Sequence, residues 1–183
     1  GLTEDTLVVF VVDNGWIQRE ETSGYAPRSK RTPYEGGVRT PILLRWPGHV
    51  EPGERTQPVS SVDLAPTILA ACGVDVPEEL PGVDLLSSED HGPVFGAAYT
   101  HNVVELGDPA SSLLTRWVLD DPHKLLVHAD PTEPTELYDV ARDPFEETPL
   151  VDPKTERALR AELEGWWPGR RPNLLVVVTD DQR

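Results

Sequence analysis

The sequence predicts an α/β protein that combines a partial sheet with a small antiparallel subdomain and a packing helix. Two apolar runs, LVVFVV at residues 7–12 and LLVVVT at residues 174–179, are rich in β-branched residues and do not alternate with polar ones. Such runs are typical of strands buried on both faces of a parallel sheet. Three later strand-like runs are separated by turn-rich stretches, which favours an antiparallel meander.

Composition excludes several classes of protein. The 183 residues suffice for one domain with a core and at most a small appendage. The 32 acidic and 16 basic residues give a net charge of −16, which would repel a phosphate backbone, so no nucleic-acid partner is expected. No apolar run approaches the roughly 20 residues that span a bilayer, so no membrane segment is expected. The single cysteine, Cys72, excludes an internal disulfide, and no cellular compartment is indicated.

The first strand, residues 7–12, ends abruptly in Asp13, Asn14 and Gly15. Residues 16–37 are polar and rich in Gly, Ser, Arg and Lys, which predicts a long irregular segment between strands. Segments of this kind often carry function when strands hold their ends. The next predicted strand is PILLRW, residues 41–46.

Helix signals follow in SSVDLAPTILAACGV, residues 60–74. Asp63 is the expected N-cap, and Gly73 is placed to end the helix in the left-handed conformation. Leu64, Ile68 and Cys72 share one helix face, which predicts that Cys72 is a core residue.

The three later strand candidates are VFGAAYT (94–100), LLTRWVL (113–119) and KLLVH (124–128). A second helix, KTERALRAELEGWW, is predicted after them, with Asp152 as its cap and Pro153 at its first position. Leu159, Leu163 and Trp166 or Trp167 form its expected buried stripe. The predicted units are therefore an α/β core over residues 1–93, a small sheet with a helix over 94–167, and a linker and strand over 168–183.

Both unalternating strands end in adjacent oxygen-bearing side chains: Asp13 with Asn14, and Asp180 with Asp181. If the two strands are parallel neighbours, these side chains meet at one edge of the sheet, where ligands bind in open α/β sheets. Clustered carboxylates need a cation, and a donor set of oxygen alone favours calcium or magnesium over zinc or copper. Taken singly, each pair also fits an ordinary turn or a helix cap.

Four segments resemble the C-terminal part of a sulfatase, in the order and spacing of that family. They are VVFVVDNG (8–15), KRTPYEGGVRTPILLRWPG (30–48), SSVDLAPTILAACGV (60–74) and ELYDVARDPFEETPL (136–150). The stretch RRPNLLVVVTDDQR (170–183) resembles the beginning of a sulfatase, so the opening strand of the family follows its closing helix. A tandem junction, a fragment and a shortened permutant would each explain this order.

The resemblance implies the alkaline-phosphatase-like α/β fold and hydrolysis of sulfate esters of small molecules or glycans. It also implies a calcium ion, with magnesium as the alternative, held by Asp13, Asn14, Asp180 and Asp181. Lys30 would contact the sulfate group, and a lysine ammonium suits a tetrahedral oxyanion.

The sequence departs from the family at the nucleophile, because it contains no C-x-P-S-R signature around a cysteine. Cys72 is not assigned that role, and no catalytic residue is predicted. The five histidines match no catalytic position of the family and are expected to be surface or core residues; they are His49, His91, His101, His123 and His128.

We therefore expect little turnover from these residues alone and association with a chain that supplies the missing central segment. Two alternatives stay open. One is a metal-dependent phosphoester or phosphonate ester hydrolase of the same superfamily. The other is a non-catalytic calcium-binding remnant or interaction module.

Overall fold

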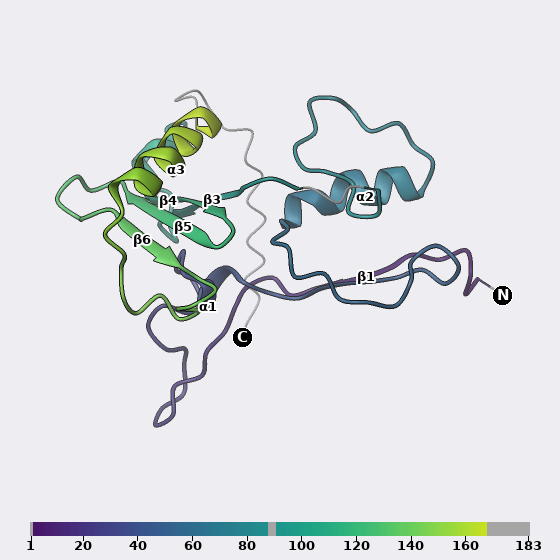
Figure 1. The fold of residues 1–183 in the computed structure, drawn as a ribbon, viewed down its shortest axis with the longest axis horizontal. Helices are drawn as coiled ribbons and strands as arrows, with labels where there is room; N and C mark the ends of the chain where they lie inside the picture. Colours follow the sequence, from purple (N-terminus) through teal and green to yellow (C-terminus); the bar gives the residue numbers. More distant parts are fainter. Residues whose placement is uncertain (1, 88–90, 168–183) are drawn as a thin grey trace.

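The computed structural model describes residues 2–87 and 91–167. It contains a two-stranded ribbon, a four-stranded sheet and three α-helices (Figure 1). In chain order these elements are β1 (Val8–Val11), α1 (Glu35–Val38), β2 (Ile42–Arg45), α2 (Leu64–Ala71), β3 (Val94–Tyr99), β4 (Leu113–Asp120), β5 (His123–His128), β6 (Glu136–Asp139) and α3 (Pro153–Trp166).

The four-stranded sheet is the antiparallel meander that the turn spacing predicts, with strand order β3-β4-β5-β6. Sequence analysis identified the first three strands but not β6. β6 pairs with β5 so that Leu126 lies opposite Glu136 and Lys124 lies opposite Tyr138. Because successive side chains of a strand point to opposite faces, Lys124, Leu126 and His128 share one face of β5, and Leu125 and Val127 share the other.

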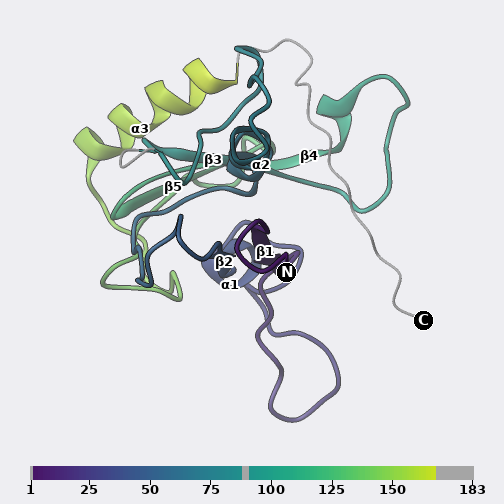
Figure 2. The same ribbon diagram turned by 90° about the vertical axis from the view of Figure 1, so that its right-hand side faces the viewer.

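The sheet is covered on both faces. On one face, α3 contributes Leu159 and Leu163 to a buried cluster with Leu125, Leu137 and other sheet residues. On the other face, Tyr34 packs beside a second cluster that contains Leu126 and Tyr138. Figure 2 shows the same order, with α3 on one side of the sheet and α1 on the other.

Helix α3 begins as the sequence predicts. The Asp152 carboxylate accepts hydrogen bonds from the backbone N–H groups of Lys154 and Thr155, and Pro153 occupies the first turn. Leu159 and Leu163 are buried, as expected. The tryptophan of the predicted buried stripe is not buried: Trp166 is 37% exposed and Trp167 is half-buried. The Trp166 ring stacks on Phe95 with the centroids 5.3 Å apart.

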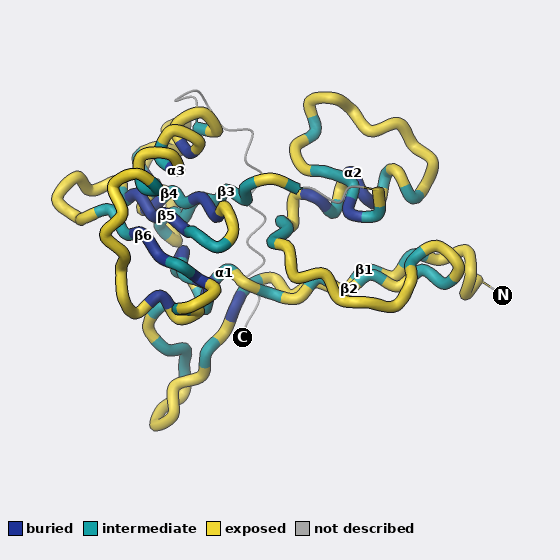
Figure 3. Tube along the Cα trace, viewed as in Figure 1, coloured by how far each residue is buried: buried dark blue, intermediate teal, exposed yellow. Residues whose placement is uncertain are grey.

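Strand β1 differs from the prediction, because it is not buried on both faces. It pairs antiparallel with β2, and Phe10 is 53% exposed. Figure 3 shows exposed and half-buried residues, but no buried ones, along β1 and β2. Val8 and Leu43 are exposed as well, whereas Val9, Ile42 and Leu44 are half-buried. The second predicted strand of the parallel pair, residues 174–179, lies outside the described residues.

Helix α2 confirms one prediction in position and corrects another. Asp63 is the N-cap residue of α2, as predicted, but its side chain caps no N–H group of that helix. A 3-10 turn, Ser61–Asp63, precedes the helix, and the Asp63 carboxylate accepts a hydrogen bond from Ser60 N–H. Cys72 is exposed, because the helix packs through its Thr67 side, where Leu85 N–H donates to Thr67 Oγ1. Gly73 ends the helix at φ +66°, as predicted.

In the described ranges, none of the helices combines the length and the apolar character that crossing a bilayer would require.

Candidate functional site

Asp13 and Asn14, the first two predicted metal ligands, lie just beyond β1, with only Val12 between the strand and Asp13. Asp13 is exposed and Asn14 is half-buried. The Asn14 side-chain N–H donates a hydrogen bond to Gly15 O at 2.8 Å, which fixes the orientation of its amide. No described residue donates a hydrogen bond to the Asp13 carboxylate or to Asn14 Oδ1. Both side chains therefore keep oxygens available to a hard cation such as calcium.

Glycines join this strand end to the start of α1. Gly15 N–H donates to Gly37 O at 2.8 Å. A Cβ added at Gly15 would lie 2.4 Å from Gly36 O, and one added at Gly37 would lie 2.4 Å from Ser29 O. These separations are shorter than any real Cβ contact, so only glycine permits the two backbones to approach so closely.

Lys30 lies on a turn that hydrogen bonds of the neighbouring Ser29 hold in place. Ser29 is fully buried, and its hydroxyl accepts a hydrogen bond from Ile17 N–H at 2.6 Å. Ser29 O in turn accepts from the Thr32 hydroxyl at 2.7 Å. The half-buried Lys30 places its Nζ 5.7 Å from the ring centroid of Trp16. Residues 28–34, which we call the Lys30 loop, therefore form one packed unit with the end of β1.

The structure brings three of the five predicted site residues into this unit: Asp13, Asn14 and Lys30. Asp180 and Asp181 lie outside the described residues. Over residues 2–87 and 91–167, no three His, Cys, Asp or Glu side chains gather closely enough to hold a metal ion. The four-ligand metal site thus stays a prediction.

A buried ion triad connects the end of the Lys30 loop to the four-stranded sheet. Lys124 on β5 is fully buried, and its Nζ lies 2.8 Å from Glu35 Oε1 and 3.2 Å from Glu146 Oε1. The other carboxylate oxygen of Glu146 accepts a hydrogen bond from Glu35 N–H. Burial raises the pKa of Glu146, and the charge of Lys124 opposes that rise. Losing either partner would leave a buried charge without compensation.

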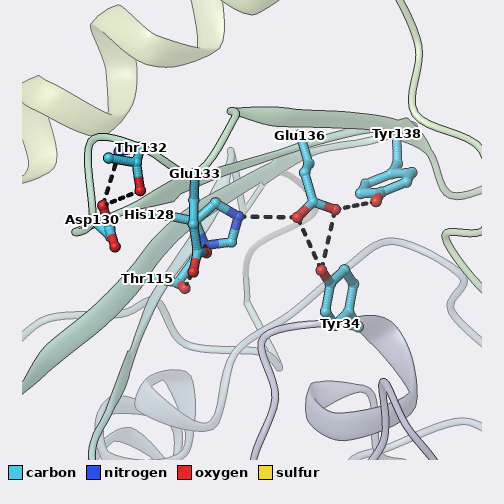
Figure 4. Close-up of polar contacts among 8 residues, drawn as sticks. All are labelled: Tyr34, Thr115, His128, Asp130, Thr132, Glu133, Glu136 and Tyr138. Carbon is cyan, nitrogen blue, oxygen red and sulfur yellow. Dashed lines mark hydrogen bonds and ion pairs between the residues drawn. The ribbon is translucent and has the colours of Figure 1, made fainter.

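A second polar network holds Tyr34 at the same face of the sheet (Figure 4). The Tyr34 hydroxyl lies 3.0 and 3.1 Å from the two carboxylate oxygens of Glu136. The hydroxyl of Tyr138 donates to the same carboxylate. The Arg28 guanidinium stacks over the Tyr34 ring, 4.6 Å from its centroid. Burial, together with the charge of Glu136, raises the pKa of Tyr34 to about 12, so Tyr34 stays protonated and remains a donor.

His128 completes this network. Its Nε2 lies 3.0 Å from Glu136 Oε1, and its Nδ1 lies 3.0 Å from the Thr115 hydroxyl and 3.3 Å from Glu133 Oε2. Burial raises the pKa of Glu136, but hydrogen bonds from Tyr138, His128 and Tyr34 outweigh it and lower that pKa overall.

Sequence analysis missed Glu136, Lys124 and Glu146 and assigned His128 to surface or core. The alternation of β5 is the signal that could have found two of them, because Lys124 and His128 share a face of a largely apolar strand. The roles of Lys124 and His128 become clear only from the pairing of β5 with β6, which places Glu136 and Tyr138 on the same face.

A family model described as N-sulphoglucosamine sulphohydrolase, C-terminal, matches residues 25–166. Human arylsulfatase A is 35% identical over 174 residues, which cover 82% of this chain and 34% of that protein. The chain thus spans about a third of the length of this curated relative.

Many solved structures are similar in fold, among them the following two. One is the structure of BT4656 in complex with its substrate D-glucosamine-2-N,6-O-disulfate, with a TM-score of 0.69 and 23% identity over 90% of this chain and 34% of that one. The other is the phosphonate monoester hydrolase SpPMH from Silicibacter pomeroyi, with a TM-score of 0.66 and 23% identity over 91% of this chain and 35% of that one.

Proposed function

The chain belongs to the sulfatase family, and from that premise we propose that it forms part of an enzyme that hydrolyses sulfate esters. Its α/β architecture is the alkaline-phosphatase-like fold of its structural neighbours. The observation that carries the proposal is the hydrogen bond from Gly15 N–H to Gly37 O, at 2.8 Å. It joins the oxygen donors after β1 to the loop that bears Lys30, so cation binding and oxyanion binding would share one unit.

The donor set of Asp13 and Asn14 fits calcium, with magnesium as the alternative, because both offer oxygens that the described residues leave without hydrogen bonds. Asp180 and Asp181 would complete the ligands. When bound, the ion would act as a Lewis acid on the sulfate group.

Lys30 would contact a sulfate oxygen. Its ammonium is a compact point charge with three donors, which matches a tetrahedral oxyanion better than a planar guanidinium does. Packing of its turn against Ile17, through Ser29, limits the freedom of the backbone that carries it. Less conformational entropy is then lost when the substrate binds.

The proposed substrate class is a sulfated small molecule or glycan. The family model for N-sulphoglucosamine sulphohydrolase and the disulfated glucosamine bound to BT4656 support this class. Because the sequence contains no C-x-P-S-R signature, we assign no nucleophile within it. These residues alone should show little turnover, and an associated segment would supply that group.

The test compares hydrolysis of an aryl sulfate by the full-length protein and its variants. Lys30→Ala should lower kcat/KM about 100-fold, as loss of a preorganised charge contact does. Lys154→Ala, at an exposed position on α3, is the matched control and should leave kcat/KM unchanged. Equal kcat/KM values for the two variants would show that Lys30 does not contact the sulfate group.

Calcium titration by calorimetry tests the metal ligands separately. Asp13→Ala should weaken binding about tenfold or more, because affinity follows the number of charged ligands. Asp75→Ala, at an exposed position after α2, is the control. Binding to Asp13→Ala with the wild-type affinity would show that the ligand assignment is wrong.

Hydrolysis of phosphonate monoesters is a second candidate function, favoured by the likeness to the Silicibacter pomeroyi enzyme. The ratio of kcat/KM for a sulfate and a phosphonate ester of the same alcohol decides between the two. If neither ester is hydrolysed while calcium still binds, the chain serves as a non-catalytic calcium-binding module.

A further inference from the structure

We propose that Glu136 is a positioning residue for Lys30, acting through the hydroxyl of Tyr34. This inference deepens the proposed function and rests on it, because it assigns a device that holds the sulfate-contacting lysine in place. Glu136 lies 106 positions after Lys30 in the sequence, and the fold brings its strand against the Lys30 loop.

The first step is the rigidity of the connection from Tyr34 to Lys30. Tyr34 is the N-cap of α1, and its carbonyl accepts hydrogen bonds from the N–H groups of Gly37 and Val38 at 2.7 and 3.0 Å. Between Lys30 and Tyr34, the turn is closed by the contacts of Thr32 with Ser29 O. A shift of the Tyr34 ring would therefore be transmitted to the backbone that carries Lys30.

Arg28 gives a second connection from the ring to the loop. Its guanidinium lies 4.6 Å from the centroid of Tyr34 and 5.9 Å from that of Tyr138. Arg28 precedes the buried Ser29 and lies two residues before Lys30, and it adopts φ +56°, an uncommon backbone conformation for arginine. Tyr34, the last residue of the Lys30 loop, thus contacts Arg28, the first residue of that loop.

Glu136 is also held by contacts other than its hydrogen bond with Tyr34. Its carboxylate accepts one hydrogen bond from the Tyr138 hydroxyl on its own strand and lies 3.0 Å from His128 Nε2 on β5. The pKa of Glu136 lies below its usual range: burial raises it, but hydrogen bonds from Tyr138, His128 and Tyr34 together outweigh that effect. Because the Glu136 carboxylate is charged and already oriented, little conformational entropy is lost when the Tyr34 hydroxyl binds to it. Glu136 can therefore hold Tyr34 in a defined position.

The docking of α1 on the sheet does not depend on Glu136. The triad of Lys124, Glu35 and Glu146 ties α1 to the sheet independently, through buried contacts that do not involve Glu136. Loss of Glu136 should therefore leave α1 docked while releasing the Tyr34 ring.

The kinetic test compares three variants of the full-length protein. Glu136→Ala should lower kcat/KM for an aryl sulfate about tenfold or more, because small misplacements of a binding group are costly. Glu136→Gln should recover part of that loss, since its amide oxygen still accepts from Tyr34. Glu133→Ala is the matched control: Glu133 also lies near His128, at 3.3 Å, but no contact joins it to Tyr34 among the described residues. Equal losses in Glu133→Ala and Glu136→Ala would overturn the proposal.

Coupling to Lys30 distinguishes positioning from a separate contribution to catalysis. In a Lys30→Ala background, Glu136→Ala should change kcat/KM by less than about twofold, because two residues that act as one unit are not additive. If the two losses multiply instead, Glu136 acts independently of Lys30 and the proposal fails.

A labelling experiment tests positioning without activity. An amine-reactive ester should acylate Lys30 about threefold faster or more in Glu136→Ala than in wild type, because a released loop exposes its amine. Lys154 provides the internal reference. Should Glu136→Ala fail to fold, Tyr34→Phe removes the same hydrogen bond and takes its place.

The labelling rate also separates the two proposals. If Lys30→Ala leaves hydrolysis unchanged, the proposed role of Lys30 in substrate binding fails, while faster labelling would still show that Glu136 holds the loop. An unchanged labelling rate of Lys30 in both Glu136→Ala and Tyr34→Phe would overturn the positioning role.

Discussion

The two halves of the molecule bury their apolar residues to very different extents. In residues 94–167, the sheet half, Leu125, Leu126 and Leu163 are fully buried between strands, α3 and Tyr34. In residues 2–87, the ribbon half, Leu43 is 57% exposed and Ile68 on α2 is 42% exposed. Among the described residues, Leu85 is the only hydrophobic side chain classed as buried outside the sheet half. Figure 3 shows the contrast along the chain.

The difference teaches that apolar residues alone do not make a core. The ribbon and α2 enclose only an open hollow of about 400 Å³, lined by Leu7, Val9, Trp46, Ile68 and neighbouring residues. Human arylsulfatase A, of which this chain spans 34%, is far longer. Exposed apolar faces of this kind favour association, so the ribbon half is where we expect a further protein segment to pack.

The largest effect on stability is expected from the buried ion triad, one of the contacts that join the halves. Lys124→Ala should lower the free energy of unfolding by about 3–5 kcal/mol, because it leaves Glu35 and Glu146 buried without their cation. Urea unfolding followed by circular dichroism measures the loss. Lys154→Ala, on the surface of α3, should fall within about 0.5 kcal/mol of wild type. A similar small change in Lys124→Ala would mean that the triad is not formed.

Core truncation should sharpen the contrast between the halves directly. Leu163→Ala removes a fully buried side chain and should cost about 2–5 kcal/mol. Ile68→Ala removes a side chain of equal size that is 42% exposed, and it should cost less than about 1 kcal/mol. Comparable losses for the two variants in urea unfolding would show that α2 is covered in solution.

Capping of α3 is expected to contribute less than its buried face. Asp152→Ala removes the acceptor for the N–H groups of Lys154 and Thr155 and should cost about 1 kcal/mol. Asp152→Asn retains an acceptor oxygen and should restore most of that loss. If Asp152→Asn and Asp152→Ala unfold at the same urea concentration, the cap does not stabilise the helix.

The smallest effect concerns the dependence of stability on pH. The pKa of Glu136 is lower in the folded state than its ordinary 4.5, so its ionised form stabilises the fold above that pH. The contribution is lost as the pH falls through the folded pKa, and it should stay below about 1 kcal/mol at this partly exposed site. As the pH is lowered from neutral to acidic, the free energy of unfolding should therefore decrease less steeply for Glu136→Gln than for wild type. Parallel pH profiles would contradict this assignment.

Local signals predicted much of the architecture. Turn spacing predicted the meander, and Asp152 with Pro153 marked the start of α3, because such signals depend on a few adjacent residues. The burial of β1 and of Cys72 was predicted wrongly. Apolar character shows that a face favours burial, but the partner that covers it is not encoded in the same segment.

The same limit applies to the candidate site. The motifs around Asp13, Asn14 and Lys30 were visible in sequence, and the two glycines of YEGG explain how their segments approach. Glu136 could not be found in this way, since its role depends on the pairing of β6 with β5 and on the return of Tyr34 to that face.

The sequence by itself determined the family, the helix cap of α3 and three of the four strands of the sheet, because each of these rests on short-range patterns or motif order. Only the tertiary structure decided which faces are covered and which carboxylates form ion pairs or hydrogen bonds with Lys124, His128 and Tyr34. The physical reason is that burial and hydrogen bonding depend on residues far apart in sequence, such as Lys124 and Glu35 at 89 positions or Tyr34 and Glu136 at 102, whose proximity exists only once the chain has folded.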